Sequence, residues 1–124
     1  MKAVLLFFFV FSCSLIQAQA SQLIMEDIAK NDLSLAEDHL YTWVMLSIND
    51  DSSTLRKKDA INKLSSYLKT IQPTGYKKRH SGKADDQRLM YSVANLSSVA
   101  GQHRLFVFTQ DDNGRVKEIR LTAI

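Results

Sequence analysis

The residue in this sequence best suited to acid-base chemistry is His80, which lies in a short basic segment. In an extended strand, side chains two residues apart share a face, so His80, Lys78 and Tyr76 are predicted to point the same way. An imidazole beside a phenol can act as a general base with an orienting hydroxyl. A base also needs an acid or a polarising partner, and the sequence places no carboxylate nearby. His80 is therefore a weak catalytic candidate, and we expect a partly buried structural histidine.

Pairs of adjacent aspartates occur at 50–51, 85–86 and 111–112. Paired carboxylates can do acid-base work or bind a metal, but all three pairs fall in predicted turns, where Asp bonds to nearby backbone amides. His39 and His103 are isolated from each other and from any Cys or Glu at metal-ligand spacing, so we expect no metal site. We also expect no cofactor, because the sequence contains no phosphate loop, dinucleotide fingerprint or nucleophile elbow.

Aromatic side chains offer a different kind of site, a pocket for an apolar or aromatic ligand. Aromatics on strands and helices also fill cores, so both interpretations stay open. The candidate pocket residues are Tyr41, Trp43, Tyr67, Tyr76, His80 and Tyr91.

The basic run Lys77-Lys78-Arg79, with Lys83 close by, suggests two uses. Such a patch can bind nucleic acid or an anionic surface. Lysines also keep an edge strand from pairing with other chains. We favour the second interpretation and expect no nucleic-acid partner.

Residues 1–20 resemble an export signal, with a lysine near the start, an apolar run and an Ala18-Gln19-Ala20 cleavage site before Ser21. The apolar run is shorter than the roughly twenty residues that a spanning helix needs, and no second one follows. We therefore expect no membrane span and a periplasmic or extracellular location. A lipoprotein anchored at Cys13 is the less favoured alternative.

Residues 21–124 are predicted to form one small domain with a single core. The only cysteine, Cys13, lies in the predicted signal, which excludes disulfides and cysteine metal sites from that domain. The full chain carries a modest net charge of +3. Without disulfides, the stability of the domain must come from packing, either within the chain alone or also against a partner subunit.

Apolar spacing predicts helices near the start of the domain, broken near Asn31-Asp32. Ser34 and Glu37 fit a capping box for a second short helix. The firmest predicted element is an amphipathic helix from Thr54 to Ile71, which Pro73 and Gly75 would end.

β-Branched and aromatic residues, bounded by turn residues, predict the strands. A first strand, Tyr41 to Ile48, stops at a turn cluster that runs to Ser53. Asp112-Asn113-Gly114 is a hairpin signal. The later predicted strands are Thr74 to Gly82, Arg88 to Ser98, Gln102 to Gln110 and Val116 to Ile124. This order predicts an α+β fold in which the N-terminal helices pack on one face of a curved antiparallel sheet.

The strand segment Leu105-Phe106-Val107-Phe108 is apolar at every position. Successive side chains of a strand point to opposite faces, so this strand should be buried on both. The helices can cover only one face, and a second copy of the protein, a curled sheet edge or a ligand must cover the other. We expect a homodimer through these four residues.

The C-terminal half carries a recognisable pattern. Its segments are Tyr76-x-x-x-His80-x-Gly82, Tyr91-x-Val93-Ala94-x-Leu96, Gly101-x-His103-Arg104-Leu105-Phe106-Val107-Phe108 and Val116-x-x-Ile119-x-Leu121. With the order of elements, this pattern resembles small exported bacterial proteins of unknown function in the nuclear transport factor two-like (SnoaL-like, cystatin-like α+β) superfamily. The resemblance implies a cone-shaped fold with a pocket between the sheet and the long helix, and often a dimer through the outer sheet face.

A fold shared by isomerases, dehydratases and binding modules does not choose a function. The sequence favours an exported, non-enzymatic domain that binds a small ligand or a partner protein as a dimer. The alternatives are a small isomerase or lyase that uses His80, and a surface or nucleic-acid binder that uses Lys77 to Arg79.

Overall fold

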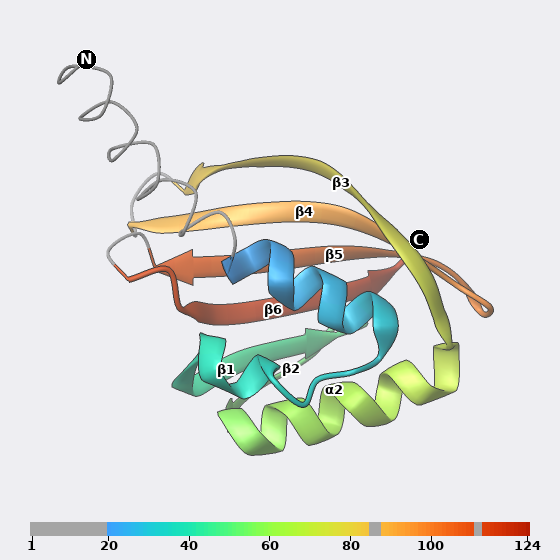
Figure 1. Ribbon diagram of the computed structural model, residues 1–124, viewed down its shortest axis with the longest axis horizontal. Coiled ribbons are helices and arrows are strands. Elements are labelled where there is room, and N and C mark those ends of the chain that lie inside the picture. The colour runs from blue at the N-terminus through green and yellow to red at the C-terminus, as the bar shows by residue number, and fades with distance from the viewer. Residues whose placement is uncertain (1–19, 85–87, 111–112) are drawn as a thin grey trace, which may run out of the picture.

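A computed structural model describes residues 20–84, 88–110 and 113–124. A helix over residues 20–30, the short 3-10 helix η1 (Ala36–His39) and the long helix α2 (Lys57–Ile71) lie on one face of a curved six-stranded sheet (Figure 1). The strands are β1 (Leu40–Ile48), β2 (Asp51–Arg56), β3 (Pro73–Ala84), β4 (Leu89–Ser98), β5 (Gly101–Gln110) and β6 (Val116–Ala123). The predicted α+β fold, with helices on one face of a curved sheet, is confirmed. Asp112, in the predicted hairpin, lies outside the described residues.

The sheet has the strand order β2-β1-β6-β5-β4-β3. Strands β3 to β6 form the predicted antiparallel meander, in which each strand pairs with the next. The last strand, β6, also pairs with β1, and this pairing is parallel. The sheet is therefore mixed and not purely antiparallel. Its parallel pair joins the first half of the chain to its end.

Strand β2 was not predicted from the sequence. The segment that follows Ile48 reads as a turn cluster, but only Asn49 and Asp50 turn, with φ angles of 48° and 73°. Positive φ angles at two central residues are typical of the tight hairpin turn that Asn and Asp tolerate. The chain then returns along β1 and pairs Leu55 with Val44. The predicted helix start at Thr54 is wrong, because Thr54 to Arg56 are strand residues and α2 begins at Lys57.

The predicted capping box at Ser34 is also wrong. The N-cap of η1 is Leu35, which makes no side-chain cap bond. The backbone amide and hydroxyl of Ser34 instead donate to Asp32 Oδ1, a turn that lowers the pKa of Asp32. The chain here bends from the N-terminal helix into η1 with turn chemistry, and not with a helix cap.

Helix α2 turns one apolar stripe toward the sheet. Ala60, Leu64, Leu68 and Ile71 are buried at the three- and four-residue spacing of a helix face. Gln72 ends the helix in the left-handed conformation, with a φ of 56°, and its amide donates to the Leu68 carbonyl.

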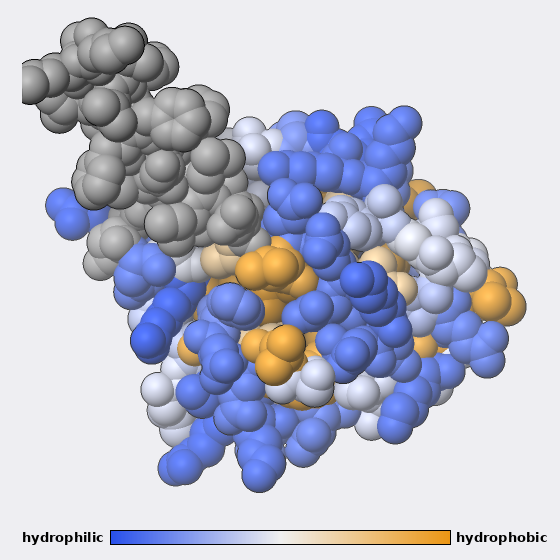
Figure 2. All heavy atoms as spheres, in the orientation of Figure 1, coloured by the Kyte–Doolittle hydropathy of each residue, from blue (hydrophilic) through white to orange (hydrophobic). Residues whose placement is uncertain are grey.

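The core lies between the helices and the sheet. Leu46, Leu105 and Leu121, from three adjacent strands, are fully buried in it. They lie in one core with side chains of the N-terminal helix and of α2. Burying one such side chain contributes about 1.5–3 kcal/mol to folding. The face seen in Figure 2, on which the helices lie, is mostly hydrophilic with small hydrophobic patches. Among the described residues, no helix lies on the opposite face of the sheet, called the outer face below.

Candidate binding surface

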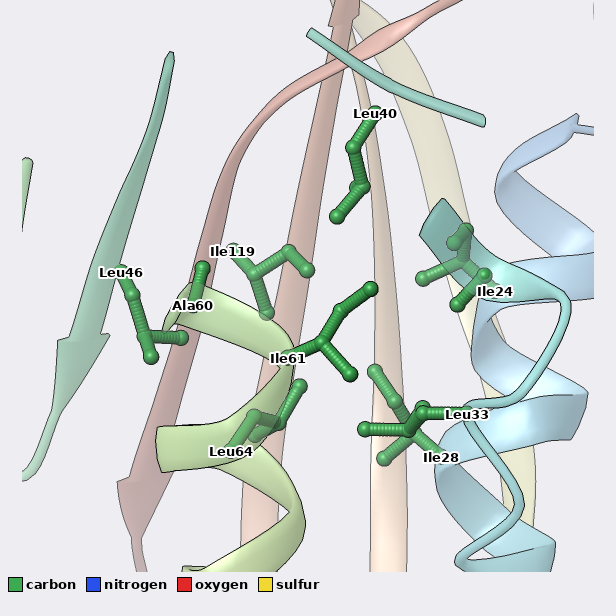
Figure 3. A pocket seen from close by; sticks show the side chains of 10 residues that line it. Ile24, Ile28, Leu33, Leu40, Leu46, Ala60, Ile61, Leu64 and Ile119 are labelled. Atoms are coloured by element: carbon green, nitrogen blue, oxygen red, sulfur yellow. The ribbon is translucent and has the colours of Figure 1, made fainter. Parts of the chain in front are cut away.

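The space between the helices and the sheet is closely packed. Ile28 of the N-terminal helix, Leu64 of α2 and Ile119 of β6 are among the apolar side chains that converge on a gap there (Figure 3). The gap has a volume of about 10 Å³, roughly the space of one water molecule. Core side chains therefore fill this part of the cone, where a ligand pocket was expected, and leave no room for a ligand in the gap.

The six predicted pocket residues do not lie together. Tyr41 accepts a hydrogen bond from Asn113 Nδ2 at 2.6 Å. Tyr76 packs against the core, where burial and the nearby Glu26 carboxylate raise its pKa. Tyr67 belongs to α2 and also packs against the core. The other three, described next, lie on the outer face.

His80 does not share a face with Tyr76, contrary to the prediction from simple alternation. A β-bulge between Lys78 and His80 shifts the pairing of β3 with β4 by one residue. Such a bulge turns the side chains beyond it to the other face. His80 consequently lies on the outer face, where its ring meets that of Tyr91 edge-on at 5.8 Å between centroids. It is also exposed, and not partly buried as expected.

His80 begins a row of rings that crosses the outer face of three strands. Tyr91 lies 6.3 Å from Phe108, and Phe108 stacks on Phe106 at the same centroid distance. The Arg120 guanidinium covers Phe108 at 5.1 Å and also pairs with the Glu118 carboxylate. Such ring contacts and cation–π contacts each stabilise by about 0.5–1.5 kcal/mol. The row is a continuous aromatic surface on a face that no described helix covers.

The four residues predicted for a dimer interface divide between the two faces. Leu105 and Val107 are fully buried in the core. Phe106 and Phe108 belong to the outer ring row and are half-buried in the single chain. The alternation predicted for this strand therefore assigns Phe106 and Phe108 to the surface that a partner can reach.

Gly82 makes room for the ring row. Gly82 is opposite Tyr91 in the β3–β4 pairing. A Cβ atom at this position would lie 2.8 Å from the Tyr91 hydroxyl oxygen, closer than real Cβ contacts come. A larger residue at position 82 would push Tyr91 out of the row.

Trp43 marks a second part of the outer face. From the sequence it was a candidate for a pocket or for the core, but 54% of its surface is exposed. On β1, Val44 and Leu46 point into the core, so Trp43 and Met45 point outward. The Arg56 guanidinium lies 5.3 Å from the centre of the indole ring.

An open depression of about 350 Å³ lies beside Trp43. It is lined by side chains of β1, β2, β4 and β6, namely Trp43, Met45, Thr54, Leu89, Lys117 and Glu118. In contrast to the interior gap, this space is large and is lined by both apolar and charged groups. No pattern in the sequence predicts it, because its residues come from four strands far apart in the chain.

A polar network at the other end of β5 runs from the buried His103 to the exposed Asn49. His103 is 3% exposed, and its Nε2 atom is 2.9 Å from the hydroxyl oxygen of Tyr67. Asn49 Nδ2 donates to the same hydroxyl at 2.9 Å, and Asn49 Oδ1 accepts from the Ala123 amide at 2.8 Å. Burial lowers the pKa of His103, because the low-dielectric surroundings disfavour the charged imidazolium.

The predicted acidic pairs and basic run occupy ordinary surface positions where they are described. Asp51 pairs with Lys63 of α2 at 3.1 Å, whereas the pairs at 85–86 and 111–112 both lie outside the described residues. Lys77, Lys78 and Arg79 are exposed on β3, which is an edge strand of the sheet as predicted. Across the described ranges, no three His, Cys, Asp or Glu side chains are grouped to hold a metal ion. None of the helices described has the length and apolar character needed to cross a bilayer.

Comparison with known proteins places this arrangement in a family. Residues 21–122 match the sequence model of a domain of unknown function, DUF4783. No curated protein is similar in sequence to the chain.

Solved structures show the same fold. A DUF4783 family protein from Bacteroides ovatus superimposes with a TM-score of 0.72 at 16% identity, covering 82% of this chain and 92% of that chain. One from Bacteroides fragilis gives 0.72 at 18% identity, covering 82% and 95%. An NTF2-like protein from Cytophaga hutchinsonii gives 0.60 at 16% identity, covering 88% and 96%. At these identities the likeness concerns the fold alone.

Proposed function

The chain belongs to the DUF4783 family of unknown function and has an NTF2-like fold, and from this premise we propose that it is an exported, non-enzymatic binding domain that pairs with a second copy of itself. The observation that carries the proposal is the aromatic row on the outer face. Its central members, Phe106 and Phe108, are only partly buried, on a sheet face that no described helix covers. Contiguous exposed apolar surface of this kind tends to mark an interface.

A second copy is the simplest cover for this surface. A two-fold axis places the same patch on both subunits, which is the commonest form of closure in soluble oligomers. The Arg120–Glu118 pair lies on the neighbouring strand β6, so opposite charges are available along this side of the apolar row. An apolar centre and a polar rim are the usual composition of such contacts.

Two further observations support a binding role over a catalytic one. His80 is exposed, and its ring packs edge-on against Tyr91 in the row. Lys77, Lys78 and Arg79 lie along the edge strand, where exposed cations prevent unwanted pairing. Both groups thus have a structural role in this fold that requires neither turnover nor nucleic acid.

The test is the mass of the purified protein in solution, measured by light scattering at high micromolar concentration. We expect a dimer for the wild type and a folded monomer for Phe106→Glu, because the new charge lies on the outer face. Val107→Glu places a charge in the core instead, and should abolish the folded circular dichroism spectrum. Leu35→Glu is the matched control, since Leu35 is an exposed apolar residue away from the sheet. A monomeric wild type, or a dimeric Phe106→Glu, would contradict the proposal.

A further inference from the structure

We propose that the depression beside Trp43 is a binding site for a small organic anion with a flat, apolar ring system. This inference goes beyond dimerisation and does not depend on it. The depression lies on the outer face and is lined from β1, β2, β4 and β6, whereas the rings of the aromatic row come from β3, β4 and β5, and the two share no residue.

The size and lining of the depression fit a ligand with an apolar body. Its volume of about 350 Å³ lies at the lower end of the roughly 300–1,000 Å³ typical of ligand pockets. Trp43 and Met45 line it and are 54% and 41% exposed, which is unusual for two large apolar side chains side by side on one strand. A compact ring system seated here would remove this apolar surface from water.

The charges around the depression select an anion. Lys117 lines it, and Arg56 lies against the indole ring of Trp43. The one carboxylate in the lining, Glu118, is already paired with Arg120. Within the described part of the chain, no ion pair is recorded for Lys117 or Arg56. The depression therefore offers uncompensated positive charge beside an apolar wall, which complements a carboxylate or sulfonate attached to a ring.

A matched pair of probes tests both parts of the inference. Anilinonaphthalene sulfonate carries a ring system and an anionic group, and N-phenylnaphthylamine has the same rings without the sulfonate. Trp43 is the only tryptophan in the chain, so quenching of its fluorescence reports binding beside it. We expect saturable quenching by the sulfonate. The sulfonate should bind about tenfold more tightly than the neutral probe, because it makes a charge-assisted contact that the neutral probe lacks.

Variants locate the site. Lys117→Gln should weaken binding of the sulfonate about tenfold and leave the neutral probe unaffected. Lys69→Gln removes the same charge from the exposed surface of α2 and should change neither affinity. Met45→Glu places a carboxylate in the depression and should repel the sulfonate without unfolding the protein, which circular dichroism checks.

Three results would each overturn the inference: no quenching of Trp43, equal affinity for the two probes, or equal losses for Lys117→Gln and Lys69→Gln. Light scattering of the wild type reports dimerisation separately from these titrations. A monomeric protein that still binds the sulfonate would refute the dimer alone. A dimer that does not bind it would refute the ligand site alone.

Discussion

At the scale of single residues, His103 connects distant parts of the molecule. The sequence identifies it only as an isolated histidine, because Tyr67 and Asn49 approach it through the fold and not through nearby positions. Its network joins α2, β5, the β1–β2 turn and the end of β6. Removing the Tyr67 hydroxyl would leave the buried Nε2 atom of His103 without this partner, at a cost of about 1–3 kcal/mol.

The network predicts how stability depends on pH. The pKa of His103 is lower in the folded protein than in the unfolded chain, so the unfolded chain binds the proton first as the pH falls. The contribution of the neutral His103 to the free energy of unfolding is therefore fully present above the unfolded pKa of about 6.5. It is lost as the pH falls below that value, and the free energy of unfolding then decreases by at most about 1.4 kcal/mol per pH unit. Urea unfolding between pH 7.5 and about pH 5 measures this slope.

Two variants separate His103 from the other histidines. His103→Gln should remove its part of the slope, because the amide binds no proton in this pH range, and His103→Asn, a second neutral amide, should do the same. If His103→Gln and the wild type lose stability in parallel as the pH falls, His103 is not the titrating group.

At the scale of elements, the sequence predicts which face of a helix or strand is buried where this depends on the spacing of its apolar residues. The stripe of α2 and the alternation of Leu105 to Phe108 were both correctly assigned, because each depends on side-chain spacing within one element. Strand β2 was missed because Asp51-Ser52-Ser53 has turn composition, and only pairing with β1 makes it a strand.

The facing of His80 and Trp43 was mistaken for a different reason. The bulge before His80 depends on how β3 pairs with β4, and no residue type in this segment predicts it. Trp43 lies outward because Val44 and Leu46 occupy the inner face, whereas its large apolar ring favoured a place in a pocket or in the core. The candidate surface itself could not be predicted from the sequence, because residues of four strands form it.

Strand β1 offers a direct test of its two faces. Trp43→Ala should change the free energy of unfolding by less than about 1 kcal/mol, because the side chain is already half in water. Leu46→Ala, three residues along on the inner face, should cost about 2–5 kcal/mol through the cavity it leaves. Chemical denaturation of both variants measures the difference. Similar losses for the two would mean that Trp43 is covered, for example by a partner subunit.

At the scale of the whole molecule, the proposed signal cleavage meets the folded domain at Ser21. Ser21 is 6% exposed, and its hydroxyl lies 3.2 Å from that of Ser92 on β4. Cleavage after Ala20 would leave this buried residue as the first of the mature chain. The Ala18-Gln19-Ala20 site predicts that intact-mass measurement of exported protein gives a chain that begins at Ser21 without lipid. A diacylated chain that begins at Cys13 would refute both the cleavage site and the absence of a lipid anchor.

The place of β6 in the sheet decides the order in which the protein can fold. The β1–β2 hairpin and the β3–β5 meander are each local, but the last strand of the chain lies between them. Its contacts are distant in sequence: Asn49 and Ala123, which are hydrogen-bonded, lie 74 positions apart. Closing so long a loop is slow, and neither half can complete the core before the C-terminus is available. A chain that crosses a membrane N-terminus first would therefore remain unfolded, and open to export machinery, until its final residues had followed.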